Sequence, residues 1–186
     1  MDRKFPSILN SELAVQVLQQ IARSNPGDYS TRIAEELDKP QSSISRVITE
    51  LNEINFTKKG KRGKAQYYRI DYEGIADYWY RQIEKQLEQH SDKDSLEKLR
   101  ENSEETKALS KRYTRKMLKN CSVAGEKTLQ QVIFGDFLSS LSANALQNED
   151  FFHKHGHLEP VSQGLVHLLQ VEGHPEEFKE CLQEEK

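Results

Sequence analysis

The sequence has few cysteines and no long apolar segment. Its 186 residues include two cysteines, Cys121 and Cys181, which lie far apart and follow no recognisable signal peptide. We therefore expect a reducing, cytoplasmic setting and inert thiols, because a disulfide between the two would require a proximity that the sequence does not show. No apolar run approaches the roughly 20 residues of a membrane-spanning helix, so we expect no membrane partner.

The sequence also lacks the motifs of common catalytic sites. Neither GxSxG nor HExxH occurs. Gly60 and Gly63 lie among lysines, without the helical pattern that follows a phosphate-binding loop. Carboxylate pairs such as Glu35 and Glu36 fall on charged helical segments, where a solvated face is the simpler interpretation. We therefore expect neither enzymatic activity nor a cofactor.

The net charge of -3 hides an uneven distribution. Residues 1–70 contain 12 Lys and Arg against 8 Asp and Glu, a balance of +4; residues 71–186 contain 15 against 22, a balance of -7. This asymmetry fits a chain in which a DNA-contacting part is joined to a part with another role.

An amphipathic helix is predicted to end near Ser24. Residues 27–56, which follow it, are predicted to form two short helices joined by a tight turn. Apolar residues recur at helical spacing over residues 30–37. Pro40 then breaks the pattern, and a second helix begins near Gln41 with a buried stripe from Ile44 to Leu51. Its outward side chains can hydrogen-bond phosphates and base edges; they are Gln41, Ser42, Ser43, Ser45, Arg46 and Thr49.

A basic hairpin is predicted to follow. The stretch TKKGKRGK, residues 57–64, carries no acid and five cations, namely Lys58, Lys59, Lys61, Arg62 and Lys64. The next stretch, AQYYRIDY, has the alternation of a strand, and the glycines suit a hairpin tip that needs positive φ. Unopposed cations on a hairpin would follow a phosphate backbone, with Tyr67 as a further expected contact.

Together, the segments YSTRIAEEL, PQSSISRVITEL and KKGKRGKAQYYRI resemble the winged helix-turn-helix domain of the broad ArsR/MarR-like class of bacterial and archaeal transcription regulators. The resemblance covers about the first 72 residues. It implies a mainly α fold with a small β-hairpin wing, residues 42–49 in the major groove of double-stranded DNA, and the wing on an adjacent groove or the backbone. Within that scheme Arg46 is the predicted guanine contact, and the serines are predicted to hold phosphates.

Residues 73–105 are predicted to form a long helix reaching about His90 and then a charged connector, which is either a solvated helix or a linker. Tyr78, Trp79 and Tyr80 are adjacent, so they cannot all face one core. In similar regulators the helix after the wing commonly makes the dimer contact. We therefore expect a homodimer interface that contains Tyr78, Trp79, Ile83 and Leu87. The alternative is that these rings complete the core of the winged domain, and both arrangements can hold together.

Residues 106–186 are predicted to form a helical C-terminal region, with helical patterns over residues 106–118, 128–146, 161–171 and 175–184. His153, His155 and His157 lie between these helices, and Cys181 follows later in the sequence. Imidazole and thiolate are zinc ligands, but the HxHxH spacing matches no specific zinc motif. Surface histidines are the preferred interpretation, and a metal effector is the less favoured one.

The sequence therefore predicts a dimeric, sequence-specific DNA-binding transcription regulator whose effector, a small molecule or a metal, is unknown. The alternative is a protein-interaction adaptor of the transcription or replication machinery that keeps the winged fold without sequence readout. Five uncompensated cations on the hairpin favour DNA over a protein partner.

Overall fold

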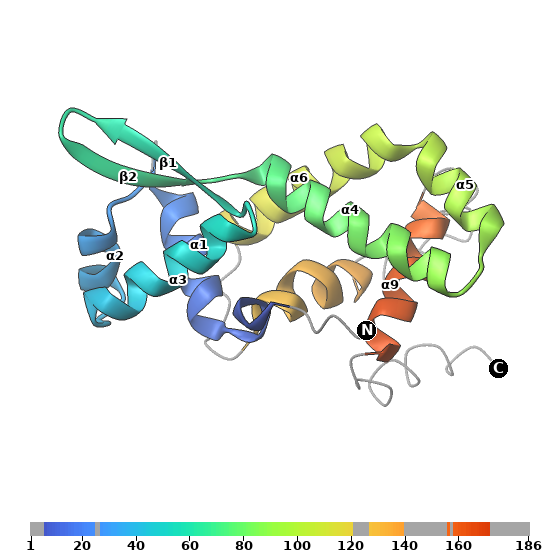
Figure 1. Ribbon diagram of the computed structural model, residues 1–186, viewed down its shortest axis with the longest axis horizontal. Helices are drawn as coiled ribbons and strands as arrows, with labels where there is room; N and C mark the ends of the chain where they lie inside the picture. Colours follow the sequence, from blue (N-terminus) through green and yellow to red (C-terminus); the bar gives the residue numbers. More distant parts are fainter. Residues whose placement is uncertain (1–5, 25–26, 121–126, 140–155, 157, 172–186) are drawn as a thin grey trace. The chain divides into compact units, whose positions relative to one another are not determined.

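The structure is a computed structural model that describes residues 6–24, 27–120, 127–139, 156 and 158–171 (Figure 1). Among them the chain is mainly helical, with one two-stranded antiparallel hairpin, as the sequence predicts. The elements are η1 (Ser7–Asn10), α1 (Glu12–Arg23), α2 (Ser30–Glu36), α3 (Gln41–Glu53), β1 (Thr57–Arg62), β2 (Ala65–Ile70), α4 (Tyr72–Gln89), α5 (Lys93–Glu101), α6 (Ser103–Asn120), the π-helical turn η2 (Gln131–Gly135) and α9 (Leu158–Val171).

The chain folds as two compact units. The first unit comprises residues 1–78 and 108–133, and the second comprises residues 79–107 and 134–186. The sequence predicts three consecutive segments, residues 1–72, 73–105 and 106–186. In the structure each unit instead combines segments that are distant in sequence. The boundaries fall within α4, α6 and η2, so each of these elements contributes to both units.

The core of the first unit is built by α1, α2 and α3. Ser11 caps α1, because its Oγ accepts the Ala14 N–H at 3.2 Å. Both α1 and α2 contact α3, and the apolar faces of all three helices are buried. The fully buried residues of this core include Leu18, Ile21, Ile33, Ile44, Ile48 and Leu51.

The turn between α2 and α3 depends on a left-handed residue before the predicted proline break. Asp38 has φ 49°, and the N–H of Lys39 donates to the Ala34 carbonyl at 3.0 Å. This geometry satisfies a carbonyl at the end of α2, and Asp is among the few non-glycine residues that tolerate it. Pro40 then stands at the N-cap of α3. The helix therefore ends at Glu36, and Pro40 sets the start of the next helix.

The hairpin pairs Thr57 with Ile70 at its base and Arg62 with Ala65 at its tip. Gly63 lies in the two-residue turn with φ 63°, which confirms the prediction of a positive-φ glycine there. Gly60 has a different role. It lies within β1 opposite Tyr67, and a Cβ added there would come 2.4 Å from the tyrosine ring. Gly60 therefore makes room for an aromatic ring on the hairpin.

Asp28 fastens the hairpin to the helices. Its backbone exchanges two hydrogen bonds with Tyr68, N–H to carbonyl at 2.9 Å and 2.7 Å, so residue 28 forms an isolated β-bridge to β2. Its buried carboxylate accepts from the Ser24 hydroxyl at 2.7 Å and from the Tyr29 N–H at 2.9 Å. One residue thus joins the end of α1, the start of α2 and β2.

A second buried carboxylate fixes the start of α4. Oδ1 of Asp71 accepts the Gly74 N–H at 3.1 Å, as an N-cap does. The backbone N–H of Asp71 donates to the Phe56 carbonyl at 2.9 Å. Gly74 lies so close to the loop after α3 that a Cβ there would come 1.9 Å from the Asn55 carbonyl oxygen. The first turn of α4 is therefore held against the end of α3.

The second unit packs the later part of α4 against α5 and α9. Gly164 of α9 faces Ile83 so closely that a Cβ would meet the Ile83 side chain at 2.4 Å. Arg100 of α5 binds Glu84 and Glu88 of α4, at 2.8 Å and 2.6 Å. The segment predicted as a charged connector therefore contains α5, an amphipathic helix that buries Leu99.

The dimer contacts expected from the sequence need correction. Trp79, Ile83 and Leu87 are buried within the chain, at 1%, 0% and 0% exposure, so their surfaces are already covered. Trp79 packs edge-on against Phe137, with ring centroids 5.0 Å apart. The expectation that adjacent rings cannot share one core is correct, because Tyr78 packs against Phe56 in the first unit instead. These rings serve intramolecular cores.

Other predicted features fall partly outside the described residues. Cys121, Cys181 and the predicted helix over residues 175–184 lie there, as does the end of the helix predicted over residues 128–146. Within the described ranges, we find no helix that combines the length and the apolar character needed to cross a membrane.

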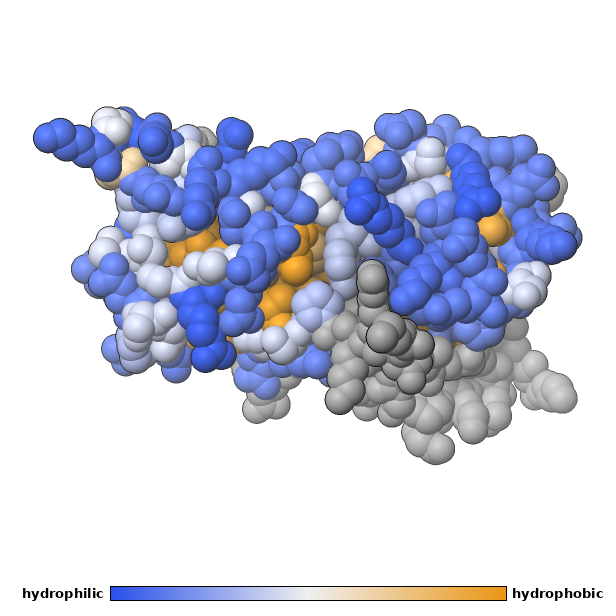
Figure 2. All heavy atoms as spheres, viewed as in Figure 1, coloured by the Kyte–Doolittle hydropathy of each residue, from blue (hydrophilic) through white to orange (hydrophobic). Residues whose placement is uncertain are grey.

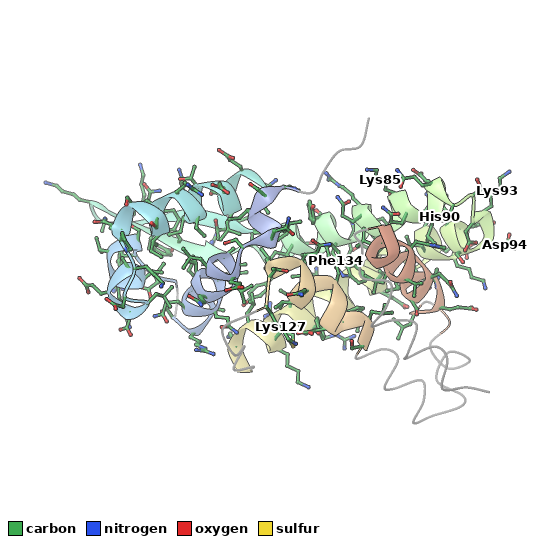
Figure 3. All side chains as sticks on the ribbon, turned by 90° about the horizontal axis from the view of Figure 1, so that it is seen from below. Lys85, His90, Lys93, Asp94, Lys127 and Phe134 are labelled. Atoms are coloured by element: carbon green, nitrogen blue, oxygen red, sulfur yellow. The ribbon has the colours of Figure 1, made fainter. Side chains whose placement is uncertain are left out.

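Two histidine rings stack in the second unit. The ring centroids of His90 and His167 are 3.8 Å apart and their planes differ by 15°, and Figure 3 shows His90 beside α9. Burial lowers the pKa of His167, and the neighbouring His90 lowers it further, while Asp92 acts in the opposite direction. The folded chain therefore favours neutral His167.

The close approach at Gly74 gives a first prediction. Gly74→Ala should lower the free energy of unfolding by about 1–3 kcal/mol, because the new Cβ meets a backbone oxygen that cannot turn away. Gly135→Ala is the control, since nothing lies within 4 Å of its Cβ position, and it should cost nothing. Urea unfolding of both variants measures the difference. Equal effects would contradict the proposed packing of α4.

The histidine stack gives a second prediction. Unfolded His167, with a pKa of about 6.5, binds a proton more readily than folded His167. The contribution of this group to stability is therefore complete above about pH 6.5 and is lost as pH falls through its folded pKa. His167→Phe keeps a stacked ring and should weaken the loss of melting temperature on acidification. Superimposable pH profiles of variant and wild type would refute this.

Candidate nucleic-acid interface

The six side chains predicted to contact DNA lie on α3. Its apolar stripe is buried against the core, which turns Gln41, Ser42, Ser45, Arg46 and Thr49 to the surface, while Ser43 is half-buried. The exposed set is uncharged apart from Arg46. The structure therefore presents a helix surface of small polar groups and one guanidinium.

Two of these side chains already have partners on the helix. Nε of Arg46 lies 3.2 Å from the Glu50 carboxylate, although the arginine side chain is 82% exposed. An exposed pair at this spacing is worth about 0.3–0.5 kcal/mol, so a stronger acceptor can displace it. The Thr49 hydroxyl donates to the Ser45 carbonyl at 2.9 Å, which leaves its oxygen able to accept.

The hairpin carries cations on both of its faces. Alternation along β1 places Lys59 and Lys61 on one face and Lys58 and Arg62 on the other. The residues paired with them on β2 are Tyr68, Gln66, Arg69 and Ala65, so no acid stands opposite a cation. In Figure 2 the projecting end of the hairpin, at the upper left, is drawn mostly in the blue of hydrophilic residues.

Four hairpin cations have no counter-charge in the described part of the chain. No Asp or Glu side chain in the described ranges lies within ion-pairing distance of Lys59, Lys61, Arg62 or Lys64. All four of these basic side chains are exposed. Like charges on one short hairpin repel one another and create a positive potential at its tip. This region is therefore suited to a polyanion.

Lys58 and Tyr67, also predicted as DNA contacts, make contacts within the chain. Nζ of Lys58 lies 2.8 Å from the buried carboxylate of Asp71. Tyr67 is half-buried over Gly60, with its ring 6.4 Å from that of Tyr29 in an edge-on arrangement. These two side chains shape the hairpin and its base, and half of the Lys58 side chain stays exposed.

Arg69 was missed as a candidate. It is exposed on β2 directly opposite Lys58, and so adds a cation to that face of the hairpin. The sequence pattern identified the strand but gave no register, and register is what brings the two cations together. The available sign of a role for Arg69 was its place in an alternating strand that pairs with a lysine-rich one.

The possible metal ligands cannot be placed in the fold, because His153, His155 and His157 lie outside the described residues. Within the ranges that are described, no three His, Cys, Asp or Glu side chains are grouped so as to hold a metal ion.

Comparison of the chain with protein-family models, with curated proteins and with solved structures finds no match.

Proposed function

We propose that the chain is a sequence-specific DNA-binding transcription regulator whose first unit contains a winged helix-turn-helix. The order of elements supports this: α1, a one-residue bridge at Asp28, α2, α3 and then the hairpin as the wing. In this proposal α3 enters the major groove, and the wing contacts the backbone or the minor groove beside it.

The observation that carries the proposal is that Lys59, Lys61, Arg62 and Lys64 of the hairpin have no acidic partner among the residues that the structure describes. Each phosphate neutralised by such a cation releases condensed counterions. Each such contact adds about 0.9 to the salt slope, the steepness with which the logarithm of the binding constant falls with the logarithm of salt concentration. A hairpin that contacted a protein would need acidic side chains on its partner to match this charge. Duplex DNA instead carries negatively charged phosphates along its whole length.

Sequence readout is assigned to α3. A guanidinium can donate two hydrogen bonds to a guanine, and a glutamine amide can pair with an adenine in a similar way. Arg46 is therefore proposed as the main base contact, with Gln41 at the start of the helix as a second, while Ser42, Ser45 and Thr49 bind phosphates or base edges.

We further propose that two copies act together, since one short helix contacts only a few base pairs. Half-sites would lie about one helical turn of DNA apart. The contact between the copies has to use surfaces other than Trp79, Ile83 and Leu87, which the fold buries.

Fluorescence anisotropy tests the proposal directly. The purified chain is titrated with the fragment upstream of its own gene and with a shuffled duplex, over a salt series. Tighter binding to the upstream fragment that persists at higher salt is expected. Absence of binding to either duplex at low salt would overturn the proposal in favour of the protein-interaction adaptor.

The division of roles between α3 and the wing gives a third prediction. Arg46→Ala should cost about 1–3 kcal/mol on the preferred duplex and little on the shuffled one. Lys61→Ala should weaken both duplexes alike and lower the salt slope by about 0.9. Arg46→Lys keeps the charge but not the two-pronged geometry, so it should lose preference as Arg46→Ala does. A uniform loss from all three variants would contradict this division.

The contact between Lys58 and Asp71 gives a fourth prediction. Lys58→Gln should lower the free energy of unfolding by about 1 kcal/mol, because a buried carboxylate loses its cation. Lys59→Gln, the neighbouring control, should leave stability unchanged and reduce DNA affinity. Urea unfolding and anisotropy on both variants measure this. Equal stabilities would show that Lys58 is one more surface cation.

A further inference from the structure

The later part of α6 is a second basic region of the first unit. Residues 108–119 contain no acid and five cations, which are Lys111, Arg112, Arg115, Lys116 and Lys119. The acidic balance of residues 71–186 as a whole gives no sign of this basic run. In the fold, residues 108–133 belong to the same unit as α3 and the hairpin. The run therefore belongs with the basic part of the protein.

The buried and exposed faces of α6 are well separated. Ser110, Thr114 and Leu118, four residues apart, are buried at 2%, 5% and 1% exposure. Arg112, Lys116 and Lys119 are exposed, and their spacing of four and three residues places them on one helix face. In the described part of the chain, no carboxylate lies within ion-pairing distance of these three. Their charge is therefore directed to solvent.

The other two cations connect this face to the base of the hairpin. The guanidinium of Arg115 lies 4.9 Å from the ring centroid of Tyr72, and Nζ of Lys111 lies 2.9 Å from the Glu73 carboxylate. Tyr72 directly follows Asp71, which binds Lys58 of β1. Figure 1 shows α6 beside the start of α4, where β2 leads into that helix. Arg115 and Lys111 thus join this part of α6 to the residues that follow the base of the hairpin.

The chemistry of this face fits a polyanion better than a lipid surface. A helix that lies in a membrane interface needs an apolar face to bury, whereas the exposed side of α6 between Arg112 and Lys119 carries no large apolar residue. Seven residues of helix rise about 10 Å, close to three base-pair steps of about 3.4 Å. Over this length each strand of a duplex carries about three phosphates, one for each of the three cations.

We propose that Arg112, Lys116 and Lys119 form a second phosphate-contacting surface, through which the first unit holds duplex DNA beyond the part contacted by α3 and the hairpin. This rests on the proposed function, since it adds contacts to the same duplex. It predicts a binding site longer than one recognition helix and one wing require.

A triple variant, Arg112→Gln/Lys116→Gln/Lys119→Gln, tests the proposal as a fifth prediction. The salt slope of binding to a long duplex should fall by up to about 2.7, that is about 0.9 for each lost contact. Between about 50 and 200 mM salt, wild-type affinity should then decline about 40-fold more than that of the variant. Wild-type affinity should also rise when the duplex is lengthened, and the variant should gain less.

The matched control removes three exposed cations of the second unit, Arg81→Gln/Lys85→Gln/Lys93→Gln, two of which are labelled in Figure 3. It changes the net charge by the same amount and should retain the wild-type slope. If the control lowered the slope equally, the effect would be one of overall charge and the proposal would fail. Thermal melting checks folding; should the triple variant unfold, Arg112→Gln alone should still lower the slope by about 0.9.

The outcomes separate this inference from the proposed function. A wild-type slope in the α6 variant, together with a reduced slope in Lys61→Ala, would overturn only the role of α6. Failure of the wild type to bind any duplex would overturn both. Preferential binding of structured RNA by the wild type, lost in the α6 variant, would reject duplex DNA as the ligand of this face.

Discussion

The arrangement of the first unit depends on the hydrogen bonds of Asp28, whose carboxylate is buried. Its side chain accepts hydrogen bonds from the end of α1 and the start of α2, and its backbone pairs with Tyr68 of β2. A carboxylate in such a place is tolerated only because its oxygens are satisfied, and loss of its partners would cost about 1–3 kcal/mol each. Helices and hairpin are therefore positioned by one acidic residue at the point where they meet.

Asp71 has a similar role at the far end of β2. Together the two aspartates anchor both sides of the hairpin by its base, and Lys58 is drawn into that base. The remaining cations are left beyond it, where no acid of the described chain opposes them. The negative charge at the base of the hairpin is thus buried, and most of the positive charge of the hairpin itself is exposed. An arrangement of this kind gives a fixed orientation to a strongly charged surface without neutralising it.

Local patterns were sufficient to predict much of the first 70 residues. Helix periodicity located α1 and α3 closely, and the alternation of AQYYRI located β2. The role of Asp28 was missed, because an Asp after Pro and Gly is also typical of an exposed turn, and only tertiary structure shows that its carboxylate is buried. Tyr67 looked like a surface ring because its glycine partner lies across a strand register that sequence alone does not give.

The packing of the remaining chain depends on long-range contacts. Trp79 and Ile83 lie on an amphipathic helix, and the sequence cannot say whether its apolar face meets another molecule or a later part of the same chain. In the structure, other parts of the same chain bury both residues. The basic run of α6 was visible in the sequence, but its significance comes from packing beside the hairpin base, which local periodicity does not encode.

The interleaved composition of the two units has a consequence for synthesis of the protein. The first unit contains residues 1–78 but is completed by residues 108–133, so a growing chain cannot finish it until the intervening stretch has been made. Leu18 and Ile75 face a small apolar cavity whose other walls come from Met117, Leu129 and their neighbours. Until those residues leave the ribosome, this apolar surface stays open to water, and the nascent helices and hairpin have one side of their core uncovered.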